Sequence, residues 1–148
     1  MKTLERNIET IKNSAKSAVS KERVWREGYT VGQGKDQGDL LMWVTDVDVS
    51  TFEEVNGDFL QLAPGSTQGS RHTVSLQSCR AYKGPNFGEF INRGTRENPK
   101  GYIDGYVLVT IEECLIAHPE HPCHIIPPGY VIQTAGQVDA RTLQWAKD

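Results

Sequence analysis

The sequence lacks several features that would place it in a class at once. No apolar run reaches the length of about 18 residues that a membrane-spanning helix requires. The N-terminal stretch MKTLERNIETIKNSAKSAVSKE has no apolar core of a secretory signal. The three cysteines are an odd number, which argues against a disulfide framework. We therefore expect a cytoplasmic protein with reduced thiols and no membrane partner.

An excess of positive charge is also missing. The formal net charge is -3 over 148 residues, so no overall field draws the chain onto nucleic acid, which is not an expected partner. The length suits one domain, and 37% hydrophobic with 24% charged residues is ordinary for a globular protein.

Three familiar site patterns fail on spacing. The run VGQGKDQGD lacks the Ser or Thr that follows Gly-Lys in a phosphate loop, and its glycines read G-x-G-x-x-x-G. His118 and His121 are separated by two residues, so they do not form the HExxH pattern of zinc proteases. His118-Pro119-Glu120 begins like a zinc deaminase, but no cysteine follows Cys123.

One amphipathic helix is predicted at the N-terminus, over residues 3–21. Its apolar stripe has spacings of four, three, four and three residues and consists of Leu4, Ile8, Ile11, Ala15 and Ala18. The stripe suits either homo-oligomerisation through residues 4–18 or packing on the chain's own sheet. We assign residues 1–24 to this helix.

Residues 25–148 are predicted to form a mainly β domain, an antiparallel barrel or sandwich. Short runs rich in Val, Ile, Leu and Tyr are bounded by Gly, Pro, Asn and Asp. The predicted strands are 39–49, 59–62, 72–79, 102–111, 125–126 with 130–134, and 142–145.

The turn APGSTQGSRH, residues 63–72, is a candidate anion site. Its glycines let the backbone approach a ligand, and its polar groups suit a phosphate or carboxylate. The candidate ligands are Ser66, Thr67, Ser70 and Arg71. The alternative is a polar hairpin loop without a ligand.

The run ECLIAHPEHPCHIIPPGYVIQ concentrates potential metal ligands. A divalent transition metal such as zinc is the candidate cofactor, held by His72, His118, His121 and His124. Glu120 is the candidate general base if the protein is an enzyme. The alternative is a structural turn made by the prolines, with Cys114 as a small buried hydrophobe.

Residues 79–101 are interpreted as a long, basic loop with five basic and two acidic residues. Arg93 and Arg96 are candidate phosphate ligands, and Tyr82 and Tyr130 are candidate stacking partners for a nucleotide base. A solvated loop without a ligand is the alternative.

The motifs QGD (37–39), LAPGSTQGSRH (62–72) and HPEHPCHIIPPGY (118–130) resemble a loose family of small phage- and bacterium-encoded β-proteins. The resemblance covers residues 27–148. The glycine-rich turns also resemble those of cupins, which implies a barrel architecture, although Ile132 stands where a cupin has its second histidine.

These observations lead to one expected function and two rivals. We expect a non-enzymatic, phage-type β-module that binds a small anionic ligand, for example a nucleotide, or a metal, at turns 65–72 and 118–129. The rivals are a metal-dependent enzyme with a histidine cluster and a structural virion or assembly subunit.

Overall fold

The computed structural model describes residues 23–25, 28–62 and 72–138. The predicted N-terminal helix, its oligomerisation stripe at residues 4–18 and the predicted strand 142–145 lie outside the described residues. Within the described part, the chain is mainly β, with one short 3-10 turn, η1 (Val49–Thr51). No helix there is long and apolar enough to cross a membrane.

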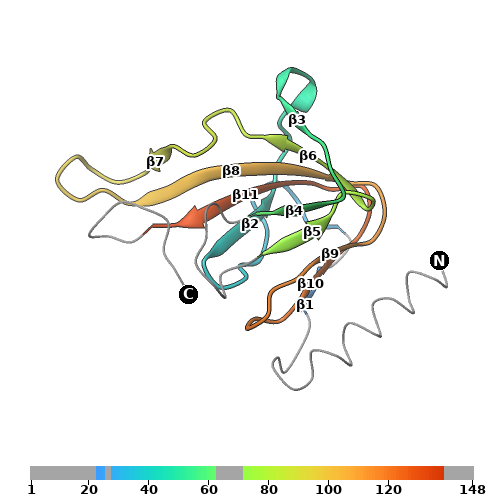
Figure 1. Cartoon of the computed structure of the whole chain (residues 1–148). Helices are drawn as coiled ribbons and strands as arrows, with labels where there is room; N and C mark the ends of the chain where they lie inside the picture. Colours follow the sequence, from blue (N-terminus) through green and yellow to red (C-terminus); the bar gives the residue numbers. More distant parts are fainter. Residues whose placement is uncertain (1–22, 26–27, 63–71, 139–148) are drawn as a thin grey trace.

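The larger sheet has a long central strand with partners on both sides (Figure 1). Its strand order is β2-β11-β8-β6-β3, and β7 also pairs with β8, all antiparallel. The strands are β2 (Leu40–Val44), β3 (Glu54–Val55), β6 (Cys79–Lys83), β7 (Phe90–Asn92), β8 (Gly101–Thr110) and β11 (Val131–Gln137).

The smaller strands form a second layer. A three-stranded sheet has the order β1-β10-β9, in which β1 and β10 are parallel, and a separate hairpin pairs β4 with β5. Two backbone hydrogen bonds of 2.9 Å between Thr73 and Ala117 join the hairpin to the end of β9. The strands are β1 (Arg23–Val24), β4 (Phe59–Gln61), β5 (Thr73–Ser75), β9 (Cys114–Ile116) and β10 (His124–Ile126).

The hydrophobic core fills the space between these layers. Leu40 and Met42 of β2 and Leu108 of β8 pack in one cluster with Ile116 of β9 and Ile126 of β10. β2 has the alternating burial that a strand with one buried face shows. The sheets do not close into a barrel, so that predicted alternative is wrong.

The strand β1 extends the β domain toward the N-terminus. Val24 pairs with Ile125 of β10, and the fully buried Trp25 follows at once. Residues 23–25 therefore pack with the β strands, just before the boundary that the sequence predicted.

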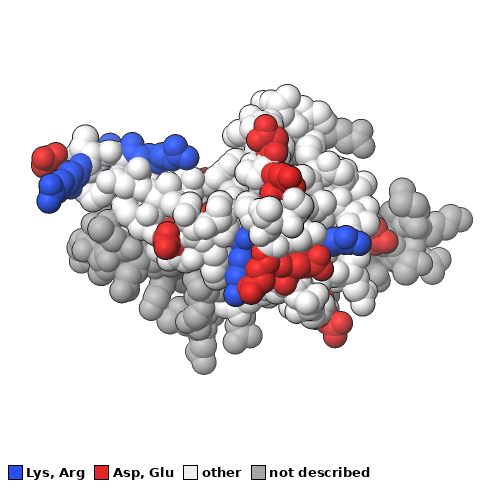
Figure 2. Space-filling model, turned by 90° about the horizontal axis from the view of Figure 1, so that it is seen from above, with Lys and Arg blue, Asp and Glu red and all other residues white. Residues whose placement is uncertain are grey.

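The segment 79–101 is not one long loop, as predicted, because it contains β6 and β7. Both strands pair with the same edge of β8, and residues 84–89 leave the sheet between them. Beyond β7, the hairpin to β8 exposes Arg93, Arg96 and Lys100. Figure 2 shows basic side chains gathered at that end of the molecule.

Candidate functional site

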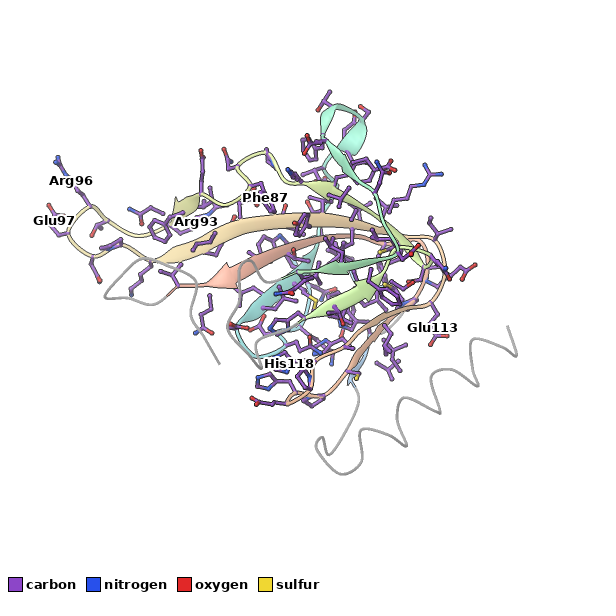
Figure 3. All side chains as sticks on the ribbon, viewed as in Figure 1. Phe87, Arg93, Arg96, Glu97, Glu113 and His118 are labelled. Atoms are coloured by element: carbon purple, nitrogen blue, oxygen red, sulfur yellow. The ribbon has the colours of Figure 1, made fainter. Side chains whose placement is uncertain are left out.

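The structure brings the two histidine-bearing turns together. His72 precedes β5 and His118 follows β9, and the Thr73–Ala117 bridge aligns these two strand ends. The ring centroids of His72 and His118 lie 4.4 Å apart, and those of His118 and His121 lie 4.5 Å apart. We call these three residues the histidine cluster. Figure 3 shows His118 at the lower side of the molecule.

His72 is fully buried and is anchored from the loop that leads into β2. Its Nδ1 lies 2.8 Å from Gln37 Oε1, and its Nε2 lies 2.6 Å from Asp39 Oδ1. Gln37 and Asp39 are buried as well. Buried polar groups need such partners, because an unmade hydrogen bond costs more than a made one gains.

The amide of Gln37 fixes which atom of His72 carries a proton. Gln37 Nε2 donates to the carbonyl oxygens of Ile116 at 3.0 Å and Pro122 at 2.8 Å. Its Oε1 is therefore the acceptor, and His72 Nδ1 must donate. Nε2 lies 2.6 Å from a carboxyl oxygen, so His72 and Asp39 share a proton in a buried hydrogen bond.

His118 has the opposite hydrogen-bond role. The backbone N–H of Glu120 donates to His118 Nδ1 at 2.9 Å, so this nitrogen is an acceptor. In the neutral ring, Nε2 then carries the hydrogen. His121 is half-buried and completes the cluster on its solvent side. The cluster thus combines a fixed hydrogen-bonded pair with imidazoles that can donate hydrogen bonds.

His124 belongs to a different environment. Its Nδ1 accepts a hydrogen bond of 3.0 Å from Trp25 Nε1, and its ring meets the Trp25 ring edge-on. Both side chains are buried. The structure therefore assigns His124 to the packing of β1 against β10.

The predicted metal site with four histidines is not formed. Across residues 23–25, 28–62 and 72–138, no three His, Cys, Asp or Glu side chains are placed so that they can share a metal ion. The reason lies in the partners: Gln37 and Asp39 occupy both nitrogens of His72, and Trp25 occupies Nδ1 of His124. Glu120, the predicted general base, is exposed.

The predicted anion ligands are only partly described by the structure. Four of them lie outside the described residues: Ser66, Thr67, Ser70 and Arg71. Arg93 donates from Nη2 to the Tyr102 hydroxyl at 3.3 Å, and Arg96 lies at the hairpin tip, away from His118 (Figure 3).

The predicted stacking tyrosines lie in different parts of the fold. Tyr130 is half-buried, and its hydroxyl accepts from the backbone N–H of Tyr29 at 3.0 Å. Tyr82 is half-buried in β6 and pairs with Glu54 of β3. The nucleotide site predicted from arginines and tyrosines stays a prediction, because Arg71 lies outside the described residues.

A second buried polar group was missed from the sequence. Asp104 accepts hydrogen bonds from Gln133 Nε2 at 2.9 Å and from the backbone N–H of Asn86 at 2.8 Å. It lies where the β8–β11 register shifts, and such bulges are common beside functional sites. Burial raises the pKa of this carboxyl above its ordinary value. The sequence did carry a signal for this group: Asp104 is the one charged residue in the run GYIDGYVLVT that forms β8.

Comparison with known proteins gives no relative: no family model, no curated protein and no solved structure matches this chain.

Proposed function

We propose that this protein is a non-enzymatic binding module for a small anionic ligand, and that the histidine cluster is its contact site. The observation that carries the proposal is the ring-to-ring packing of His72, His118 and His121, which come from two turns far apart in the sequence. Phosphate, a phosphate monoester or a carboxylate is the expected ligand class.

The hydrogen-bond donors of the cluster favour an anion. The Asp39–His72 pair holds the cluster in place and uses both ring nitrogens of His72. His118, whose Nδ1 accepts from Glu120 N–H, presents an Nε2–H group, and the half-buried His121 adds a second imidazole. Hydrogen bonds to an ionised acceptor such as an oxyanion are among the strong ones.

The first test is an NMR titration of the full chain with sodium phosphate and with a nucleoside monophosphate, at constant ionic strength. Imidazole resonances of His118 and His121 should shift and saturate. Replacing His121 with Ala should weaken binding about tenfold, the cost of about one charge-assisted hydrogen bond. Fitting the resonances of all three cluster histidines gives the dissociation constant.

Arg96→Gln is the matched control, because it also removes one basic side chain but lies on the β7–β8 hairpin. Its affinity should stay within about twofold of the parent protein, since exposed charges beyond a Debye length are screened. Unsaturated shifts for every anion, or equal losses in both variants, would reject the histidine cluster as the site.

Homo-oligomerisation remains part of this proposal, with residues 4–18 as the contact between copies. Light scattering on the full chain and on a chain lacking residues 1–22 tests it. The same number of chains per particle in both samples would remove residues 4–18 as the contact between copies and leave the binding site untouched.

A further inference from the structure

A hollow of about 620 Å³ lies on a different part of the molecule from the histidine cluster. It is formed by Thr51 at the end of η1 with the next two residues, by Lys83 at the end of β6, and by residues 84–87 and 89, which leave the sheet between β6 and β7. Figure 3 shows Phe87, which lines it, above β8, whereas His118 lies below. The volume lies in the range of small-molecule sites, although the hollow opens widely to solvent.

The wall made by residues 84–89 is fixed by hydrogen bonds. Gly84 N–H donates to Gly105 O at 3.0 Å, and Gly88 N–H donates to Asp104 O at 2.8 Å. The Asp104 carboxylate accepts from Asn86 N–H at 2.8 Å. A Cβ on Gly84 would lie 2.6 Å from Gly105 O and 2.7 Å from Asp104 Oδ2, so only glycine fits. The wall is therefore set before any ligand arrives.

The hollow contains the two kinds of group that recognise an ammonium ion. Glu53 and Glu89 supply two carboxylates, against one lining ammonium group, that of Lys83. Phe52 and Phe87 supply aromatic rings, and a ring face attracts a cation through its quadrupole. Carboxylate and ring together favour a positively charged ligand over an anion.

Lys83 shows where such a cation sits. Its Nζ lies 2.8 Å from Glu53 Oε2 and 5.7 Å from the centroid of the Phe87 ring. Lys83 is half exposed and Glu53 more so, and an exposed ion pair of this kind contributes little to stability. A ligand ammonium can therefore take the place of the Lys83 ammonium at small cost.

We propose that this hollow is a second binding site, that it takes a small organic ammonium ion, and that Lys83 is its internal occupant in the free protein. The ligand places its cation between Glu53 and the Phe87 ring, and its alkyl part lies along the wall at Gly84. This site is independent of the proposed anion site, so either proposal can fail alone.

The test is a titration of the full chain with n-butylammonium chloride, followed by backbone amide NMR, with sodium chloride at the same ionic strength as the reference. Resonances of residues 51–53 and 83–89 should shift and saturate. Lys83→Ala removes the internal occupant and should tighten binding about threefold to fivefold, the value of one exposed cation–π contact. Lys100→Ala removes an exposed lysine from the β7–β8 hairpin and should leave the affinity unchanged.

Phe87→Leu should weaken binding about fivefold, because it removes the ring face but keeps an apolar side chain. Phe87 also packs on Tyr106, with centroids 4.6 Å apart, so the Lys83 variant decides the matter if the Phe87 variant does not fold. Shifts no larger than those in sodium chloride overturn the proposal. So does weaker binding in Lys83→Ala. Saturable binding of sodium phosphate that depends on Lys83 would show that the hollow is an anion site, and this result would also overturn the proposal.

Discussion

His72 and His124 are both fully buried histidines, yet their surroundings demand different hydrogen-bond roles. His72 Nδ1 donates to Gln37 Oε1, and its Nε2 shares a proton with Asp39 Oδ1. His124 Nδ1 accepts a hydrogen bond from the indole N–H of Trp25, so this nitrogen carries no hydrogen of its own. Burial alone therefore does not decide the state of an imidazole. The donor or acceptor character of its partners does.

The difference also separates a binding region from a structural one. His72 packs on the buried His118, and His118 packs on the half-buried His121 at the solvent side of the cluster. His124 lies between Trp25 and the strand β10, in the packing of the second layer. The same residue type thus serves a candidate site in one place and strand packing in another.

The largest effect is expected from removing the carboxyl group beside His72. Asp39→Ala should lower the free energy of unfolding by about 3 to 5 kcal/mol, because it removes one partner of the buried Asp39–His72 pair. Asp39→Asn should cost clearly less, since an amide N–H can donate to Nε2 of a neutral His72. Urea unfolding of both variants measures the difference.

Equal losses in the two variants would mean that the negative charge at position 39, rather than a hydrogen-bond partner for Nε2, is what His72 requires. Nitrogen chemical shifts of His72 give an independent reading: two protonated nitrogens in the parent protein and one in Asp39→Asn.

A smaller effect is expected from the partner of His124. Trp25→Phe should cost about 2 to 3 kcal/mol, because it leaves the buried Nδ1 acceptor without its donor and removes part of a buried ring. Trp43→Phe is the matched control. Trp43 is half-buried against the Tyr102 ring, so the same change there should cost less than about 1 kcal/mol. Thermal unfolding compares the two; equal costs would contradict the assigned role of the Trp25–His124 bond.

Much of the β architecture could be predicted from the sequence, and the exceptions have physical causes. The predicted strand 102–111 is confirmed as β8, whereas the predicted unit of 125–126 with 130–134 is divided between β10 and β11, which lie in different sheets. β6 was missed because CRAYK was interpreted as part of a basic loop. Its buried and exposed residues alternate, which is the pattern of a strand with one buried face.

The histidine cluster could be predicted only in part. The sequence marked His72, His118 and His121 as candidates, but their proximity depends on the pairing of Thr73 with Ala117, which no spacing in the sequence fixes. Gln37 and Asp39 were noted within a motif and not as partners of His72. Their role follows from long-range contacts, and the metal prediction failed on those contacts.

Asp104 is a third buried ionisable group, and its donors are neutral: the side chain of Gln133 and the backbone N–H groups of Asn86 and Gly105. Burial raises its pKa, so the folded state binds the Asp104 proton more tightly than the unfolded state does. Its contribution therefore falls as the pH rises from the ordinary carboxyl range through the raised pKa. Asp104→Asn removes this term.

The stability of Asp104→Asn relative to the parent protein should therefore improve with rising pH across that window, by less than about 1 kcal/mol. A constant offset between the two proteins is expected as well. The carboxylate accepts from Gln133 and Asn86 through separate oxygens, whereas the Asn side chain has only one acceptor oxygen. The pH dependence of the difference in urea midpoint, not the offset, carries the argument. A difference that stays flat with pH would show that the carboxyl titrates alike in the folded and unfolded chains. If the variant instead became less stable relative to the parent protein as the pH rises, Gln133 and Asn86 would stabilise the charged carboxylate more than burial destabilises it.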